Sequence, residues 1–252
     1  MAEPLEKPLP HAVLDLPSRQ WKALKIERLL ELDSRPGPLR LLEVGTGSGG
    51  IAHYFGTHPS GRFEVDAVDV VDNRLVREGF RYTPVTDTTL PFADECFDIV
   101  LSNHVIEHVG DEAAQMTHLS ELRRVLKPDG IGYLAVPNRW MLVEPHYRLA
   151  FLSWLPVRLR SPYLRLRGRG RIYDCRPLMV DQIERLLGEA GYDFVQEHGR
   201  ALRLTYEIER PRALPYRLVL SRLPDAVYRG LRRAFPTLIY RLTRAERIGA
   251  AR

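Results

Sequence analysis

Residues 39–50 read Leu-Arg-Leu-Leu-Glu-Val-Gly-Thr-Gly-Ser-Gly-Gly, an apolar run that passes directly into a cluster of glycines. A short apolar run that ends in glycines is typical of a buried strand followed by a tight turn. Glycine tolerates positive φ and lets a ligand approach the backbone closely. Gly45, Gly47 and Gly50 also satisfy the pattern G-x-G-x-x-G, in which a helix N-terminus binds a diphosphate. The segment predicts a nucleotide-type ligand and leaves its chemistry open.

The chain around this turn alternates between strand-like and helix-like segments. Strands are expected over 39–44, 63–70, 81–85, 97–102, 131–136, 192–197 and 202–208. Helices are expected over 12–32, 48–58, 72–79, 112–126 and 180–190. The alternation from 39 to 137 specifies a parallel sheet with helices on both faces. Ligands of such a sheet bind beyond the carboxyl ends of its strands.

Two carboxylates near the turn bear on the ligand. Glu43 lies two residues before the first glycine, where a carboxylate suits a cationic, phosphate-free ligand and opposes a diphosphate. Asp69 ends the second strand and suits the two ribose hydroxyls that either kind of nucleotide cofactor carries. Glu43 therefore argues against a dinucleotide, whereas Asp69 supports a nucleotide site without choosing between the two.

Three further blocks follow the glycine turn. Residues 90–100 read LPFADECFDIV, residues 103–109 read NHVIEHV, and residues 122–130 read LRRVLKPDG. Together with the turn, these blocks resemble the class I methyltransferases that depend on S-adenosylmethionine and act on small molecules, lipids and sugars. The resemblance covers about residues 39–137, and the helix at 180–190 also fits. It implies S-adenosylmethionine as cofactor and a Rossmann-like, doubly wound α/β fold of seven strands, the last of them antiparallel.

The resemblance also assigns roles to individual residues. It places Glu43, Gly45, Gly47 and Gly49 at the methionine end of the cofactor, Asp69 at the ribose, and Val70 against the adenine. Asn103 and His104 would border the methyl group. The family usually has an acidic residue four positions before Leu-Pro-Phe, but Thr86 stands there in this chain. Asp87, one position later, is the better candidate for the adenine amino group.

Methyl transfer needs little acid–base apparatus, because the sulfonium is already activated and the enzyme mainly aligns the nucleophile. A hydroxyl acceptor gains from a base with a pKa near 7, which favours histidine. His146 and His104 are the candidate catalytic residues, and His108 is a weaker one. A packed or solvated histidine is the alternative reading for each.

Residues 139–176 interleave aromatic residues and arginines, and a segment this long without regular structure predicts a lid or substrate pocket. Trp140, Tyr147, Arg148 and Trp154 are the candidate substrate-binding residues, because aromatic rings stack on an acceptor and guanidinium groups bind phosphate. The sequences Glu-Pro-His-Tyr at 144–147 and Leu-Ser-Trp-Leu-Pro at 152–156 also resemble methyltransferases of bacterial cell-surface glycan and lipid pathways.

The net charge of +5 is unevenly distributed. Residues 145–176 hold eight arginines and one acidic residue, and residues 201–252 hold twelve arginines and four acidic residues. Residues 212–252 are expected to form a basic, amphipathic helical extension of a domain that ends at 211, with residues 139–176 inserted as the lid. Such a helix can lie on an anionic membrane surface, although the same spacing also packs against a protein core. An arginine-rich composition without function is the alternative explanation of the charge.

No signal peptide or membrane-spanning run is evident, so a soluble, cytoplasmic protein is expected, with a peripheral place on the inner face of the plasma membrane as an option. The cysteines, Cys96 and Cys175, predict neither a metal cluster nor a disulfide framework, and no metal is expected.

The first hypothesis is O-methylation of a glycan, a lipid-linked sugar or a lipid-like acceptor. Methylation of a quinone or another small metabolite is the alternative enzyme, and a non-catalytic, cofactor-binding scaffold is the alternative from another class. A nucleic-acid partner is not expected, because residues 102–105 read SNHV and lack the Asn/Asp-Pro-Pro-aromatic motif of exocyclic-amine methylases.

Overall fold

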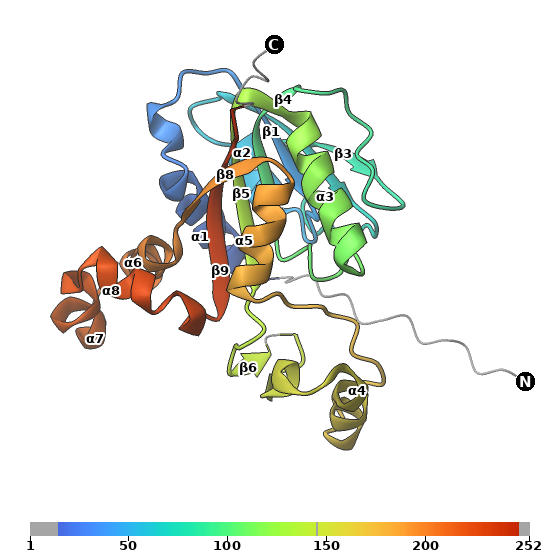
Figure 1. Ribbon diagram of the computed structural model, residues 1–252. Coiled ribbons are helices and arrows are strands. Elements are labelled where there is room, and N and C mark those ends of the chain that lie inside the picture. Colours follow the sequence, from blue (N-terminus) through green and yellow to red (C-terminus); the bar gives the residue numbers. More distant parts are fainter. Residues whose placement is uncertain (1–14, 145, 247–252) are drawn as a thin grey trace, which may run out of the picture.

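The computed structural model describes residues 15–144 and 146–246. Its centre is a seven-stranded sheet of order β3-β2-β1-β4-β5-β9-β8 (Figure 1). The strands are β1 (Leu39–Val44), β2 (Phe63–Asp69), β3 (Arg81–Pro84), β4 (Phe97–Asn103), β5 (Leu126–Pro137), β8 (Tyr192–Gln196) and β9 (Thr237–Arg244). The first five pair in parallel, whereas β9 runs antiparallel to both β5 and β8. The expected seven-stranded sheet with an antiparallel last strand is confirmed.

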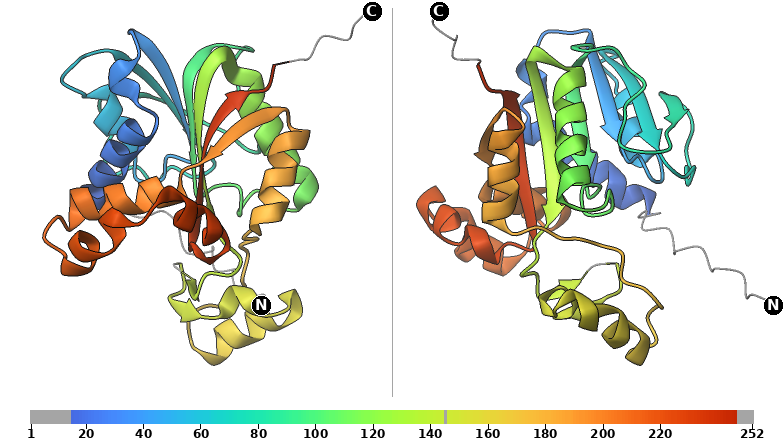
Figure 2. Two further views of the ribbon diagram at one scale, coloured as in Figure 1. Left: turned by 60° about the vertical axis from the view of Figure 1, so that its left-hand side comes forward. Right: turned by 45° about the vertical axis from the view of Figure 1, so that its right-hand side comes forward.

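Helices cover both faces of this sheet (Figure 2). One face carries α1 (Leu16–Leu29), α2 (Gly50–Gly56) and α6 (His198–Glu209), and the other carries α3 (Glu112–Val125) and α5 (Val180–Glu189). Side chains alternate across a strand, so Leu41 packs with the first group and Leu42 with the second. Both faces are therefore buried, which explains why these strands read as continuous apolar runs.

The last strand differs from the sequence prediction. Residues 202–208 lie in helix α6, where Ala201 and Leu204 are buried at helical spacing and Lys25 of α1 donates to Thr205 Oγ1. The final strand is β9, from the segment predicted to be a helical extension. Its consecutive apolar side chains Leu238, Ile239 and Tyr240 are buried because β9 lies between two strands and beneath helices on both faces. The predictions of a strand at 202–208 and of a helix at 237–244 were wrong.

The helix predicted at 72–79 is also absent, since residues 72–79 form bends without helical structure. Asp72 accepts hydrogen bonds from the backbone amide and the guanidinium of Arg74, at 3.2 and 2.8 Å. A side chain that bonds to nearby backbone in this way competes with helix formation. The other predicted helices are present within a few residues of their expected bounds.

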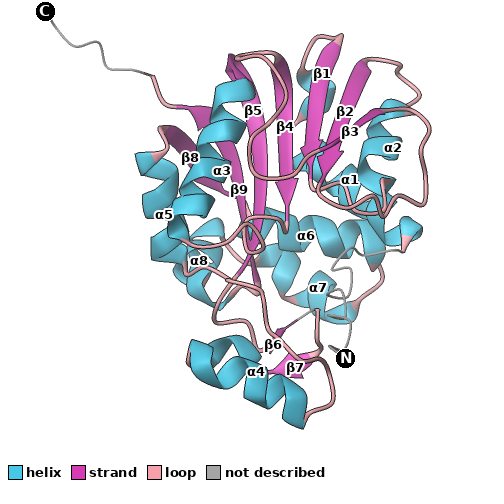
Figure 3. Cartoon of the chain, turned by 90° about the vertical axis from the view of Figure 1, so that its right-hand side faces the viewer, coloured by secondary structure: helices cyan, strands magenta, loops and turns pink. Residues whose placement is uncertain are grey.

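Residues 138–176 form a small unit beyond the carboxyl end of β5 (Figure 3). It contains the short strands β6 (Val143–Glu144) and β7 (Leu149–Ala150), a 3₁₀ turn (Leu152–Trp154) and α4 (Val157–Leu166). Its own buried cluster consists of Leu149, Leu152 and Leu164. We call this unit the lid.

A second protrusion replaces the single amphipathic helix predicted after residue 211. It consists of α7 (Leu214–Leu218), α8 (Asp225–Gly230) and 3₁₀ turns at Leu220–Arg222 and Arg232–Ala234. Arg203 of α6 anchors it, with its guanidinium 2.8 Å from Asp225 Oδ1 and 4.8 Å from the Tyr228 ring. A domain boundary at residue 211 would separate β9 from its sheet. No helix of the described residues has the length and apolar character needed to cross a bilayer.

The position of β9 predicts that alanine substitution of two leucines, one before and one within this strand, changes the free energy of unfolding by very different amounts. Leu238 is fully buried, so Leu238→Ala is expected to lower the free energy of unfolding by about 2–5 kcal/mol. Leu231→Ala is the matched control, because Leu231 is 53% exposed and should change that free energy by no more than about 0.5 kcal/mol. Urea denaturation measures both, and equal effects would place β9 outside the core.

Candidate active site

The glycine turn has the backbone geometry that its sequence predicts. Gly45, Gly47 and Gly49 have φ of 75°, 54° and 80°, a region that side chains with a Cβ rarely adopt. A Cβ on Gly45 would lie 2.3 Å from Cγ2 of Val105, in the loop after β4. All three glycines are therefore favoured by the positive φ of the turn, and Gly45 also by the close approach of the neighbouring loop.

The amides of this turn are largely used within the protein. Gly45 and Thr46 donate to the carbonyl of Val68, at 2.9 and 3.2 Å. Gly47 donates to Asp69 Oδ2 at 2.8 Å, which ties the turn to the end of β2. The Gly45, Thr46 and Gly47 amides are therefore engaged within the protein and are not free to donate to a diphosphate.

Glu43 lies behind the turn and is 2% exposed. Its Oε2 accepts hydrogen bonds from Thr46 Oγ1 at 2.7 Å and from the Ala52 amide at 3.0 Å, so it joins the turn to the start of α2. Burial raises the pKa of Glu43 to about 8, although these hydrogen bonds and the charge of Arg19 oppose the shift. Arg19 Nε is itself buried, with no hydrogen-bond partner among the described residues.

A cavity of about 450 Å³ opens at the carboxyl ends of β1, β2 and β4. Four of the predicted cofactor residues line it, namely Gly45, Asp69, Val70 and Asp87. The wall also includes Thr86, Leu90, Val105, His108 and His118. Glu43, Gly47, Gly49 and Asn103 are not among the lining residues. Asn103 Oδ1 is buried at the end of β4, with no hydrogen-bond partner in the described part of the chain.

His118 is a wall residue that sequence reasoning missed. It lies on α3, 2% exposed, with its Nε2 3.0 Å from Ser102 Oγ. Burial lowers the pKa of His118 to about 4, so the ring is neutral. The signal was its helical spacing with Gln115 and Leu122, which lie on the same buried face of α3.

His104 directly follows β4 and has a φ of 59°, which is uncommon for a residue with a Cβ. Its Nδ1 lies 3.4 Å from Oε1 of Glu107, a fully buried carboxylate. Burial alone would raise the pKa of Glu107, but His104 and His108 hold it below its usual value. His104 is not a lining residue of the cavity, so its predicted role at the methyl group stays a prediction.

His146 lies beside the cavity wall rather than on it. Its ring is 5.2 Å, centroid to centroid, from that of the wall residue His108. Glu144, 1% exposed, accepts a hydrogen bond at 2.7 Å from His146 Nδ1 and another at 2.7 Å from the Tyr147 amide. Burial opposes protonation of His146, but the contact with Glu144 prevails and raises the pKa of His146 above its usual value.

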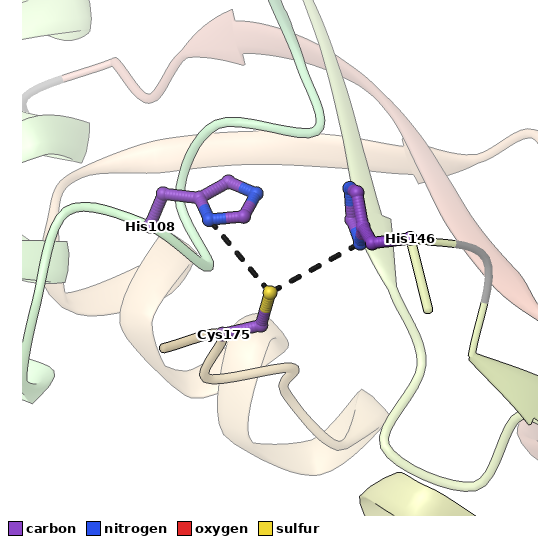
Figure 4. Close-up of side chains that lie close together, drawn as sticks. All are labelled: His108, His146 and Cys175. Carbon is purple, nitrogen blue, oxygen red and sulfur yellow. Dashed lines mark hydrogen bonds between the residues drawn. The ribbon is translucent and has the colours of Figure 1, made fainter. Parts of the chain in front are cut away.

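Cys175 completes this group (Figure 4). Its Sγ lies 3.8 Å from His108 Nδ1 and 4.0 Å from His146 Nδ1. Burial, together with the nearby carboxylates, raises the pKa of the Cys175 thiol well above its usual range. The spacing of the two cysteines in the sequence could not reveal this group, because Cys175 meets histidines from other segments and not Cys96.

The four predicted substrate-binding residues all lie in the lid, and none lines the cavity. The rings of Trp140 and Trp154 pack edge to face, 5.5 Å apart, and Trp154 Nε1 donates to the Met141 carbonyl. The Tyr147 hydroxyl donates to Asp174 at 3.2 Å, and Arg148 is exposed with a φ of 53°. Their contact with a substrate stays a prediction.

Comparison with known proteins agrees with this geometry. Residues 42–134 match a family model described as a methyltransferase domain. An uncharacterized methyltransferase of Mycobacterium sp. (strain KMS) is 33% identical over 111 residues, which cover 41% of this chain and 40% of that protein. A ubiquinone biosynthesis O-methyltransferase of Dinoroseobacter shibae is 29% identical over 174 residues, 64% of this chain and 62% of the relative. The chain thus spans less than two thirds of the curated relatives that it matches.

Solved structures show the same fold at low sequence identity. A methyltransferase in complex with the Haloferax volcanii Trm112 methyltransferase activator has a TM-score of 0.54 and 17% identity, covering 92% of both chains. The Burkholderia thailandensis 1,6-didemethyltoxoflavin-N1-methyltransferase has a TM-score of 0.50 and 17% identity, covering 91% of this chain and 79% of that one.

The sheet order and the cavity beside the glycine turn define a Rossmann-like methyltransferase fold of class I. Residues 42–134, which run from β1 into β5, are the part of the chain that resembles a methyltransferase domain.

The raised pKa of Glu43 predicts a pH-dependent stability. At pH values between 4.5, the ordinary pKa of a glutamate, and about 8, Glu43 is protonated in the folded protein but ionised in the unfolded chain. The free energy of unfolding therefore falls as the pH rises through this range. Glu43→Gln cannot ionise. The unfolding free energy of E43Q minus that of the wild type should therefore increase from pH 5 to pH 8, by an amount on the order of a few kcal/mol.

Urea denaturation of the cofactor-free protein at several pH values measures this difference. Glu64→Gln is the control, because Glu64 is exposed on β2 and its difference from the wild type should stay constant. A pH-independent difference for E43Q as well would contradict the burial of an ionisable carboxyl at this turn.

Proposed function

We propose that the protein binds S-adenosylmethionine in the cavity beside the glycine turn and transfers its methyl group to a hydroxyl of a lipid-like or glycan acceptor. The observation that carries the proposal is the hydrogen bond from the Gly47 amide to Asp69. It makes the Gly47 amide unavailable to a diphosphate, and it supports the assignment of the Asp69 carboxylate to a ribose. A sulfonium nucleoside carries no phosphate and loses nothing by this arrangement.

In this proposal each cofactor group meets residues of matching chemistry. Asp69 accepts from the ribose hydroxyls, Val70 packs on the adenine, and Asp87 accepts from the adenine amino group. Gly45, Gly47 and Gly49 leave room for the methionine chain, with Glu43 behind them and Asn103 near the methyl group.

On the acceptor side we assign activation of the hydroxyl to His146, with His104 as the second candidate. The Glu144 carboxylate accepts a hydrogen bond of 2.7 Å from His146 Nδ1. This contact orients the ring and favours its protonation. The acceptor oxygen then forms the new bond to the methyl carbon, and the electron pair of the broken carbon–sulfur bond stays on sulfur. The hydroxyl proton leaves through His146.

The lid supports an acceptor with an apolar part. Its exposed side chains alternate between apolar residues and arginines, a pattern that suits an amphiphilic or phosphate-bearing molecule at an anionic surface. The apolar set is Trp140, Leu142, Val143, Phe151, Trp154, Val157, Leu159, Leu166 and Ile172. The exposed arginines are Arg148, Arg158, Arg165, Arg167, Arg169, Arg171 and Arg176.

A quinone-like acceptor is the second candidate, because several relatives are ubiquinone biosynthesis O-methyltransferases. It shares the hydroxyl and the apolar part with the first candidate. A non-catalytic scaffold would have no need of the His146–Glu144 pair next to the cavity.

The cofactor site predicts a specific loss in Asp69→Ala. Two charge-assisted hydrogen bonds to ribose are each worth about 1.5–3 kcal/mol, so affinity for S-adenosylhomocysteine should fall about 100-fold or more. Calorimetry measures it, with thermal unfolding to verify that D69A is folded. Asp72→Ala is the control, since Asp72 lies on the same loop but pairs with Arg74 and Arg77. Wild-type protein that binds NAD and not S-adenosylhomocysteine would overturn the proposal.

The acceptor side predicts a slow His146→Asn enzyme. With methyl-labelled donor and a lipid extract as acceptor, H146N should transfer label about 10²- to 10³-fold more slowly than the wild type, with KM for the donor unchanged. The wild-type rate should rise with pH through the raised pKa of His146, because only the unprotonated ring accepts a proton. H146N should lack this rise.

His58→Asn is the control, because His58 pairs with Ser60 and Glu27 near the end of α2, on the other face of the sheet. Wild-type rates for H146N would exclude the assigned role. Label that enters only the aqueous extract would contradict a lipid-like acceptor while leaving the methyltransferase activity in place.

A further inference from the structure

Three donor side chains from distant segments converge beside the cavity wall (Figure 4). His108 comes from the loop after β4, His146 from the turn between β6 and β7, and Cys175 from the segment that returns from the lid. One donor atom of each lies within 4.8 Å of the other two. Cys175 is 3% exposed, and the two histidines are mostly covered.

The backbone around these residues holds them together. The Arg176 amide donates to the carbonyl of Glu107 at 2.7 Å, so each ligand-bearing segment is fixed to the other directly beside Cys175 and His108. The buried Gln115 amide donates to the carbonyls of Ile106 and Arg176, both at 3.4 Å. On the lid side, Glu144 fixes His146 and the Tyr147 amide. The cluster is therefore supported from the core and from the lid.

We infer that His108, His146 and Cys175 form a binding site for a divalent ion of the zinc class. One thiolate and two imidazoles are ligands that zinc prefers, and three protein ligands with an open fourth position are typical of a reactive zinc centre. Zinc bonds of about 2.0–2.3 Å place tetrahedral ligand atoms about 3.5 Å apart. The observed sulfur–nitrogen distances of 3.8 and 4.0 Å need a small contraction, in which His146 Nδ1 would exchange its hydrogen bond to Glu144 for the ion.

The charges around the cluster favour a cation. Glu144 lies 2.7 Å from His146, Asp174 Oδ1 lies 3.7 Å from the Cys175 sulfur, and Glu107 Oε1 lies 3.9 Å from His108 Nε2. Glu107 and Glu144 are both buried. A carboxylate beside the outer nitrogen of a histidine that binds metal is the usual support of such a site, and Glu107 has this place at Nε2 of His108, whose Nδ1 faces Cys175. Among the described residues, Arg160 is the buried arginine of the lid, and it donates to the carbonyls of Leu155 and Ser153 rather than to these carboxylates.

An ion at this position would join the lid to the core, because His146 and Cys175 belong to the lid and its return segment while His108 belongs to the loop after β4. It would also lie next to the wall residue His108, and with the ion bound the metal, in place of the coordinated His146, would favour deprotonation of a hydroxyl. This second role rests on the proposed function. The binding of the ion does not.

The test is binding of Zn²⁺ and Co²⁺ to the full, untagged chain without cofactor or acceptor. After exposure to Zn²⁺ and dialysis, the wild type should retain one equivalent by elemental analysis. Co²⁺ should give the thiolate-to-cobalt charge-transfer absorption, which requires a cysteine ligand. Cys175→Ala and His108→Ala should lower the affinity for Zn²⁺ at least tenfold and remove this absorption.

Cys96→Ala is the matched control, because Cys96 lies at the opposite end of β4 and should leave both readouts unchanged. Failure of the wild type to retain zinc or to give the cobalt absorption would overturn the inference, as would equal retention by C175A and the wild type. These measurements use the unmodified wild type first, so poor folding of a variant cannot hide a negative result. A zinc-loaded protein that transfers no methyl group would count against the proposed function and leave the metal site standing.

Discussion

The hydrogen bond between the Gly47 amide and the Asp69 carboxylate is the contact on which the cofactor side of the molecule depends. It joins the turn after β1 to the end of β2, two neighbouring parallel strands, and so fixes the floor of the cavity. It also engages the Gly47 amide within the protein, which leaves that amide unavailable to a phosphate. Positive φ at Gly45, Gly47 and Gly49 is what lets the turn reach this position.

The parallel strands β1 to β5 could be predicted from the sequence, because each buried strand among them is a short apolar run bounded by turns. The antiparallel end could not. Leu202, Leu204, Tyr206 and Ile208 alternate as in a strand, yet the contacts of α6 with α1 and β9 make this segment a helix. The apolar run of β9 resembles part of a helix because both faces of the strand are buried. Its partner β5 lies about a hundred residues earlier, beyond the reach of local patterns.

The two halves of the candidate site differ in the same way. Asp69 ends a strand and Gly45 and Val70 directly follow strands, so strand order alone brings them to one edge of the sheet. His108, His146 and Cys175 meet only because the lid folds back and the Arg176 amide pairs with Glu107. Neither the periodicity nor the spacing of residues in the sequence reveals that the lid folds back in this way. The composition of the lid, rich in aromatic residues and arginines, led to the prediction of a substrate site there. Composition alone does not reveal that other residues line the cavity.

In the proposed reaction, buried carboxylates lie at both ends of the reacting centre, with Glu43 behind the turn and Glu107 and Glu144 on the side assigned to the acceptor. Methyl transfer turns a cationic sulfonium into a neutral thioether, so a strong negative field would stabilise the donor more than the transition state and slow the reaction. A Glu43 with a pKa of about 8 is largely protonated at neutral pH and keeps its hydrogen bonds to the turn without a full charge. On the acceptor side, histidines or a divalent ion offset the carboxylates. In the proposed reaction, the protonation of Glu43 and the neutralisation of Glu107 and Glu144 would allow the cavity to bind the sulfonium without stabilising it more than the transition state.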